Sequence, residues 1–351
     1  MKKPLLLPAL QMLAVLASGA TLHATAADCG KPGTMTGTGG VTLQVRVFDD
    51  GSIAVRAPLA VNPDGGPASY TVGDHGFTYI ANGLALWRGG RRESCKAECM
   101  ASFRQAEAAG FAAGTAEFCV FAMEIEPLQP GQALTKCAGG VVAGNGKGRP
   151  AKGAMLATLA GDPMQGYIST TSLQHLVGGK PQYLNAEQLP VAVAPDVKML
   201  GKLAWVDGRR VGLGRGFALI GDKGPAFGEG SIALHQLLRD GAVSVQKTGP
   251  IAVSQRCTAA ETSLRPPFQS RPDGGSADRC RPGRTATTAS DVRAYIGIDQ
   301  PLDFVVLGKA ALPRKGAVMQ AEVSSGSMAA AAADAGYSAE KLQQMLACLA
   351  S

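Results

Sequence analysis

Apolar and polar residues alternate along short stretches of this chain. From Val41 to Val47 every second residue is apolar, which predicts a β-strand. The segment Ile53-Ala54-Val55 follows after the turn residues Asp49-Asp50-Gly51, so the two segments are expected to form a hairpin. Further short apolar runs, bounded by glycine and proline, are expected to form strands: 217–220, 294–298 and 304–307.

Helical patterns are confined to a few segments. Cys95, Cys99, Phe103 and Ala106 share one stripe, which predicts that residues 91–113 are helical. Two further helices are expected where a serine N-cap precedes an apolar pattern: Ser231 to Arg239, closed by Gly241, and Ser338 to Leu349.

Two segments carry little structural pattern. Residues 138–153 are rich in glycine and are expected to form a linker or an exposed loop. The alanine run at 328–333 is of low complexity and carries no functional signal. With 46 glycines and few aromatic residues, the composition favours a β-rich (α+β) fold with many loops.

The N-terminus has the pattern of a secretory signal peptide. Lys2 and Lys3 precede an apolar run, and Ala24-Thr25-Ala26 matches a cleavage site. The alternative is a lipoprotein with Cys29 lipidated, although the charged Asp28 before it argues against this. We therefore expect a secreted or periplasmic protein of about 325 residues with no membrane segment after signal removal, which is enough for one large domain or two modest ones.

All eight cysteines follow the expected signal peptide. An even number in an exported chain predicts disulfides, although Cys95-x-x-x-Cys99 leaves zinc binding as an alternative. The expected pairings are Cys257 with Cys280, Cys29 with Cys348, and 95, 99, 119 and 137 among themselves.

The formal net charge is +7, or +5 once Lys2 and Lys3 are removed (7 − 2). A mildly basic surface would attract anionic polymers such as cell-wall material. Dense runs of lysine and arginine with interleaved aromatic residues are absent, so we do not expect nucleic-acid binding.

The segment 221–234 holds the strongest candidate chemistry. Asp222 and Glu229 flank the turn residues Gly224-Pro225, so both carboxylates are expected to face one cleft. Inverting glycosidases place two carboxyl groups about 6.5–9.5 Å apart, one as general acid and one as base. Because Glu229 precedes a helix start, it is assigned as the base and Asp222 as the acid, an assignment that is open to reversal. Turn and capping roles are the structural alternative.

This segment resembles the chitosanases of glycoside hydrolase family 75 and their bacterial relatives. The family pattern G-D-x-G-P…G-E-x-S-I-x-L is similar to Gly221-Asp222-Lys223-Gly224-Pro225…Gly228-Glu229-Gly230-Ser231-Ile232-Ala233-Leu234. Residues 167–173 resemble its Y-x-S-x-T-S-L block, and 62–70 with 79–83 resemble its N-terminal block. The resemblance implies that Asp222 and Glu229 are the catalytic pair.

The chain departs from the family in three ways. The fungal enzymes have more residues between the two acids, Thr78 stands where the family has Asp before the tyrosine, and 91–137 has no recognised counterpart. D-x-G-P followed by a helix start also resembles double-psi β-barrels such as the expansins. We therefore expect a six-stranded double-psi-like barrel with a Cys-rich, partly helical insertion. The expected regions are 1–27 (signal peptide), 28–90 (N-terminal β segment), 91–153 (Cys-rich insertion and linker), 154–310 (catalytic barrel) and 311–351 (tail and helix).

Several polar residues are candidates for binding saccharide: Tyr167, Thr170, Thr171, Ser172, Lys223 and Ser231. Trp205 is a further candidate, but core packing is the favoured explanation for it. His75 and His235 leave a Ser/His/Asp triad open, although no G-x-S-x-G elbow is present. Gly212-Leu213-Gly214-Arg215-Gly216 lacks the residues of a nucleotide-binding loop and is expected to be a hairpin turn.

The sequence thus predicts an exported, monomeric, endo-acting glycoside hydrolase that cleaves a β-1,4-linked aminosugar polymer, with chitosan implied by the resemblance, and that uses no metal or cofactor. Chitosan is cationic, as is this protein, which argues against that substrate. One alternative is an enzyme acting on peptidoglycan, which is anionic. The other is a non-catalytic module that binds cell-wall saccharide or inhibits a toxin.

Overall fold

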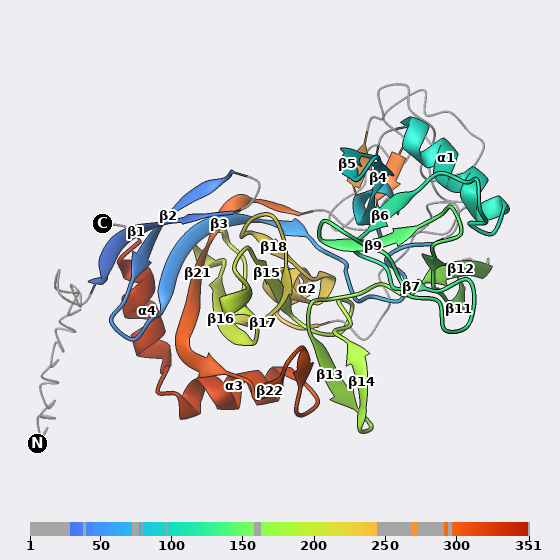
Figure 1. Cartoon of the computed structure of the whole chain (residues 1–351). Coiled ribbons are helices and arrows are strands. Elements are labelled where there is room, and N and C mark those ends of the chain that lie inside the picture. The colour runs from blue at the N-terminus through green and yellow to red at the C-terminus, as the bar shows by residue number, and fades with distance from the viewer. Residues whose placement is uncertain are drawn as a thin grey trace, which may run out of the picture.

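A computed structural model describes most of the chain from Cys29 onward (Figure 1). The described residues are 29–37, 40–71, 77–78, 80–95, 97–157, 163–243, 269–271, 291–293 and 297–349. The expected signal peptide, the expected Cys257–Cys280 disulfide and most of the expected strand at 294–298 lie outside them.

Six strands form a closed barrel, which confirms the predicted β-rich fold: β3 (Ile53–Val61), β15 (Val191–Ala194), β16 (Lys202–Asp207), β17 (Arg215–Lys223), β18 (Glu229–Gly230) and β21 (Ile298–Ala311). Their order is β3-β18-β15-β17-β16-β21, and β21 pairs with β3 to close the ring. The β3–β18 and β15–β17 pairs are parallel and the others are antiparallel. Because β3 belongs to the barrel, the barrel is not confined to the expected range 154–310.

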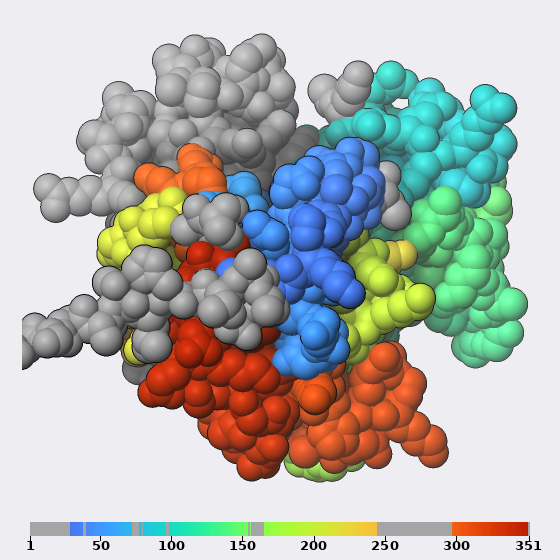
Figure 2. Space-filling model, turned by 90° about the vertical axis from the view of Figure 1, so that its left-hand side faces the viewer, coloured from blue at the N-terminus to red at the C-terminus, as the bar shows by residue number. Residues whose placement is uncertain are grey.

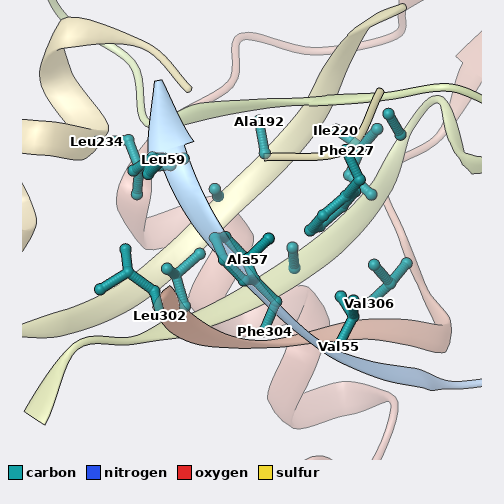
Figure 3. Packing of buried hydrophobic residues seen from close by; sticks show 14 of the residues in the cluster. Val55, Ala57, Leu59, Ala192, Ile220, Phe227, Leu234, Leu302, Phe304 and Val306 are labelled. Carbon is teal, nitrogen blue, oxygen red and sulfur yellow. The ribbon is translucent and has the colours of Figure 1, made fainter. Parts of the chain in front are cut away.

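Alternate residues of each strand fill the barrel interior, as the period of two in a strand requires. Val55, Ala57 and Leu59 of β3 point inward to meet Phe304 of β21 (Figure 3). The ring of Phe227, from the segment before β18, packs edge-on against Phe304 at 5.1 Å between centroids. The intervening residues of the strands face outward and form a second apolar layer.

Helices α3 (Ser325–Asp334) and α4 (Ala339–Ala347) cover part of this outer layer, whereas α2 (Ile232–Asp240) packs Leu234 and Leu238 against the interior cluster. The expected N-caps are confirmed, because Ser231 accepts from the backbone of Leu234 and Ser338 from that of Lys341. The alanine run, which suggests no structure by its pattern, lies within α3. It is helical because alanine favours the helix and because Met328 is buried against the barrel.

The two ends of the described chain meet on one face of the molecule. The strands β1 (Lys31–Thr36) and β2 (Thr42–Val47) extend the sheet beyond β3, which confirms the expected hairpin. The Cys29–Cys348 disulfide, also as expected, joins this hairpin to the end of α4. Figure 2 shows the hairpin in blue beside the C-terminal helices in red.

Residues 84–150 form a second unit, which we call the lobe (right of Figure 1). Its sheet has the order β5-β4-β6-β9-β8, and helix α1 packs beside it. The disulfides Cys95–Cys99 and Cys119–Cys137 confirm that these four cysteines pair among themselves, so Cys95 and Cys99 are not zinc ligands. The elements are β4 (Leu84–Arg88), β5 (Arg91–Ser94), α1 (Ala97–Ala108), β6 (Phe118–Val120), β8 (Lys136–Cys137) and β9 (Gly140–Ala143).

Two predictions for the lobe were wrong. Residues 91–94 pair with β4 as a strand, so the helix within 91–113 begins only at Ala97. The segment 138–153 is not a linker, because Val142 and Ala143 of β9 are fully buried. Its glycines allow close backbone contacts instead, since a Cβ on Gly140 would lie 2.2 Å from the carbonyl oxygen of Val120.

Smaller elements complete the described structure: β7 (Ile125–Glu126), β10 (Arg149–Pro150), β11 (Lys152–Ala157), β12 (Pro163–Tyr167), β13 (Gln174–Val177), β14 (Lys180–Tyr183), β19 (Gln269–Arg271), β20 (Asp291–Arg293), β22 (Arg314–Lys315), β23 (Val318–Met319), and the 3-10 helices Ile80–Gly83, Val197–Met199 and Arg209–Val211. Within the described residues, no helix combines the length and apolar character needed to cross a membrane.

Candidate active site

A pocket of about 770 Å³ lies between the barrel and the lobe. The barrel contributes the ends of β3, β17 and β18, including Asp222 and Glu229. The lobe contributes Arg92 and Phe121, and the segment after β3 contributes Asn62 and Asp64. The two predicted acids therefore share one cavity, whose far wall belongs to the lobe.

Asp222 and Glu229 occupy matching positions on the two neighbours of β15. Val193 of β15 pairs with Asp222 on one side and with Glu229 on the other. Residues directly opposite in a sheet point to the same face, and two strand spacings separate their backbones by about 9–10 Å. That face is the outer one, because Ala192 and Ala194 point into the barrel.

A bulge in β17 directs Asp222 to this outer face. Ile220 pairs with Ala192 but Asp222 pairs with Val193, so Gly221 is the extra residue. Without the bulge, Asp222 would take the inward-facing position beside Ala194. Glycine suits this place, because a Cβ on Gly221 would lie 2.3 Å from Cδ1 of Leu184.

The carboxylate of Asp222 is buried and well supplied with donors. Its Oδ1 accepts hydrogen bonds from Ser172 N (2.9 Å), Ser172 Oγ (2.6 Å) and Lys223 N (2.9 Å). Burial raises the pKa of Asp222 above its ordinary value, and these hydrogen bonds act in the opposite direction. The donors favour the ionised form of Asp222.

Glu229 has fewer donors. Burial, and then the charge of Asp222, raise the pKa of Glu229, while a hydrogen bond from the Asn62 side chain lowers it. The raised pKa of Glu229 differs from the expectation that the N-terminus of α2 would favour the ionised form of this residue. The first turn of α2 is already capped by Ser231, whose Oγ accepts from Leu234 N at 3.1 Å.

Asn62 connects the two acids. Its Oδ1 accepts a hydrogen bond from Asp64 N at 2.8 Å, which leaves its NH₂ group to donate elsewhere. Hydrogen bonding to the Asn62 side chain lowers the pKa of both Asp222 and Glu229. One amide side chain therefore lies beside both carboxyl groups.

Asp64 is a third carboxyl group in the pocket. Burial, followed by the charge of Asp222, raises the pKa of Asp64 well above its ordinary value. Its Oδ1 accepts a hydrogen bond from the buried Tyr70 hydroxyl at 2.8 Å. Burial and the neighbouring charges therefore favour the neutral form of Asp64 more than that of an exposed aspartate, since three carboxylates at such close quarters repel one another.

Four of the predicted saccharide-binding residues do line the pocket: Thr170, Thr171, Ser172 and Lys223. Ser172 also orients Asp222, while the Thr171 hydroxyl is occupied by the backbones of Leu173 and Leu184. Of the four, Thr171 is buried, Thr170 and Ser172 are partly exposed, and Lys223 is exposed.

Tyr167 and Ser231 do not line the pocket, and their assignment as saccharide-binding residues was wrong. Tyr167 is 1% exposed, packs edge-on against Phe103 and donates its hydroxyl to Glu107. Ser231 is 2% exposed because its hydroxyl caps α2 and bonds the backbones of Leu189 and Val191. Both side chains are buried and stabilise the fold.

The other candidates lie elsewhere. Trp205 packs on the outer layer against Phe217 with ring centroids 4.7 Å apart. His235 is fully buried, and its two ring nitrogens contact the backbone oxygens of Ser231 and Leu59, so it does not form a catalytic triad. His75 lies outside the described residues. Within the described ranges, no group of three or more His, Cys, Asp or Glu side chains is arranged to hold a metal ion.

Sequence reasoning missed Asn62, Asp64, Tyr70 and Arg92 as pocket residues. Asn62-Pro63-Asp64-Gly65 has the composition of a turn, and its position directly after a buried strand was the available signal. Arg92 carries no such signal, because its place at the pocket depends on how the lobe packs.

The comparisons with known protein families and with curated proteins found no match.

Proposed function

We propose that this protein is an exported, endo-acting glycoside hydrolase that cleaves a β-1,4-linked aminosugar polymer. The observation that carries the proposal is the placement of Asp222 and Glu229 on either side of Val193, facing one pocket. The resemblance to family 75 chitosanases assigns the same two residues. The signal-like N-terminus and the three described disulfides support export.

The surroundings of the two acids suggest their roles. Burial raises the pKa of both acids, but Asp222 accepts three hydrogen bonds from Ser172 and Lys223, whereas the charge of Asp222 raises the pKa of Glu229 further. We therefore assign Asp222 as the ionised base and Glu229 as the proton donor. This reverses the assignment suggested by the sequence.

In the reaction, Glu229 protonates the glycosidic oxygen as the bond from that oxygen to the anomeric carbon breaks. Asp222 takes a proton from a water molecule, whose oxygen bonds to the anomeric carbon from the opposite side. The product therefore has the inverted configuration. The mechanism requires no metal or cofactor, and a double-psi arrangement of the barrel is part of this proposal.

The decisive experiment measures reducing ends released from chitosan by the purified protein. Glu229→Gln and Asp222→Asn are each expected to lower kcat by about 10²–10⁴-fold with unchanged circular dichroism. Exposed Glu322→Gln is the matched control and should retain activity. The anomer formed first, followed by NMR, tests inversion; a retained configuration would contradict the direct attack of water.

One observation favours a second candidate, an enzyme acting on peptidoglycan. The cations Arg92 and Lys223 line the same pocket, which suits an anionic glycan better than cationic chitosan. Release of reducing ends from cell-wall sacculi but not from chitosan would favour this candidate. Binding of glycan without turnover, unchanged in Asp222→Asn, would instead indicate a non-catalytic module.

A further inference from the structure

We propose that the lobe provides a subsite for a carboxylate group, centred on Arg92, so that the preferred polymer is an aminosugar glycan that carries carboxylates. This inference rests on the proposed function for the cleavage step but not for binding. It gives the lobe, which has no recognised counterpart in the family, a role in substrate choice.

The Arg92 guanidinium is held in place at the pocket wall. It stacks over the ring of Phe121 at 4.3 Å from the ring centroid, and its Nη1 donates to the carbonyl oxygen of Ala138 at 3.2 Å. Both Arg92 and Phe121 line the pocket. Stacking limits the freedom of the side chain, so less entropy is lost when it binds a ligand.

In the part of the chain that the structure describes, no carboxylate pairs with Arg92. Its neighbour Arg88, in contrast, pairs with both Glu93 and Glu98. The guanidinium of Arg92 retains N–H donors that match the two oxygens of a carboxylate.

Strand geometry separates Arg92 from the adjacent Arg91. Successive side chains of a strand point to opposite faces, so in β5 only one of the two arginines reaches the pocket. Arg91 pairs in register with Arg88 on the other face. This difference supplies a control residue with the same charge on the same strand.

The pocket is therefore charged differently at its two ends. The barrel and the segment after β3 contribute the three acids and Lys223, while Arg92 belongs to the lobe. Among the described residues, no ion pair joins Arg92 to any of these acids. A glycan with ammonium groups would be repelled at the lobe, whereas one with carboxylates would gain a bidentate contact there.

The test uses three polymers with the same β-1,4-linked aminosugar backbone and different charges: carboxymethyl chitin (anionic), glycol chitin (neutral) and glycol chitosan (cationic). Binding is measured by affinity electrophoresis and cleavage by reducing ends. We expect the protein to bind carboxymethyl chitin most tightly, with binding that weakens as salt concentration rises.

Arg92→Gln is expected to weaken binding of carboxymethyl chitin about 10-fold or more, through KM rather than kcat, and to affect glycol chitin less. Arg91→Gln is expected to behave as the unmodified protein on all three polymers. Equal losses in the two variants, or a preference for glycol chitosan, would overturn the subsite. If Glu229→Gln cleaves as well as the unmodified protein, the proposed catalysis fails, while the binding comparison still decides the subsite.

Discussion

The barrel and the lobe face one another across the pocket, but they are stabilised in different ways. The barrel has two apolar layers, one inside the ring of strands and one beneath α3 and α4. The lobe has a single core around Phe103, whose ring packs edge-on against Phe111 and Phe118. Two disulfides join segments within the lobe.

This difference matters for the site. Asp222 and Glu229 lie on paired barrel strands, so backbone hydrogen bonds on both sides of β15 determine their spacing. Arg92 lies on β5, which the sheet order places at an edge of the lobe. This comparison is consistent with our two proposals, in which the barrel carries the catalytic acids and the lobe contributes to the choice of ligand. Surfaces that vary between related proteins are commonly carried by such peripheral units.

The largest expected effect is on the barrel core. Phe304→Ala removes a fully buried ring that packs against Phe227, and should lower the free energy of unfolding by about 3–5 kcal/mol. Urea unfolding followed by circular dichroism measures this change. Val41→Ala, at a side chain 52% exposed in the N-terminal hairpin, should change it by less than about 0.5 kcal/mol. Similar values for the two variants would contradict the assigned core.

Removal of the Cys119–Cys137 disulfide should loosen the lobe and spare the barrel. The two cysteines are 18 residues apart, and a loop of this length is stabilised by about 3 kcal/mol when closed. In Cys119→Ser/Cys137→Ser, hydrogen exchange should accelerate in β6 and β9 but not in β15 and β17. Equal acceleration in both regions would show that they unfold as one unit.

A matched variant addresses the other end of the molecule. Cys29→Ser/Cys348→Ser should accelerate exchange in β1 and α4, because this disulfide joins those two elements. Exchange in the lobe should stay unchanged, which would separate the local effects of the two bridges.

The smallest expected effect concerns Asp64, where the two regions meet. The pKa of Asp64 is raised in the folded state above its ordinary value of 3.8. Asp64 therefore stabilises the folded protein when the pH is below 3.8, and this stabilisation is lost as the pH rises through the raised pKa. Asp64→Asn should remove that loss, which amounts to at most about 1.4 kcal/mol per pH unit for one proton. Melting temperature measured against pH reports the change.

Asp50 provides a control of opposite sign. Burial raises the pKa of Asp50, but hydrogen bonds from Ser52, Tyr337 and Lys341 lower it by more, so the pKa in the folded state lies below 3.8. The stability that Asp50 contributes is present above pH 3.8 and is lost as the pH falls through the lowered pKa. Asp50→Asn should therefore lower stability at neutral pH, whereas Asp64→Asn should raise it. The same direction in both variants would contradict the raised pKa of Asp64.

Local features of the sequence were enough to predict several elements. The hairpin of β2 and β3 follows from alternation and a short turn, and α2 follows from Ser231 and Gly241. These elements depend on residues close together in the chain, where turn and capping chemistry acts directly. The pairing of Cys29 with Cys348 was also predicted, but from counting cysteines rather than from local structure.

The sequence by itself determined which strand precedes Asp222, which helix follows Glu229 and that both acids border one turn, whereas in the structure the strand continues through Asp222. Only the tertiary structure decided which way they face, since the bulge at Gly221 is defined by pairing with β15. It also brought Asn62 and Asp64 beside them and placed Arg92 opposite, while it buried Tyr167 in the core. These outcomes depend on strand register and on packing between segments far apart in the chain, which no local pattern encodes.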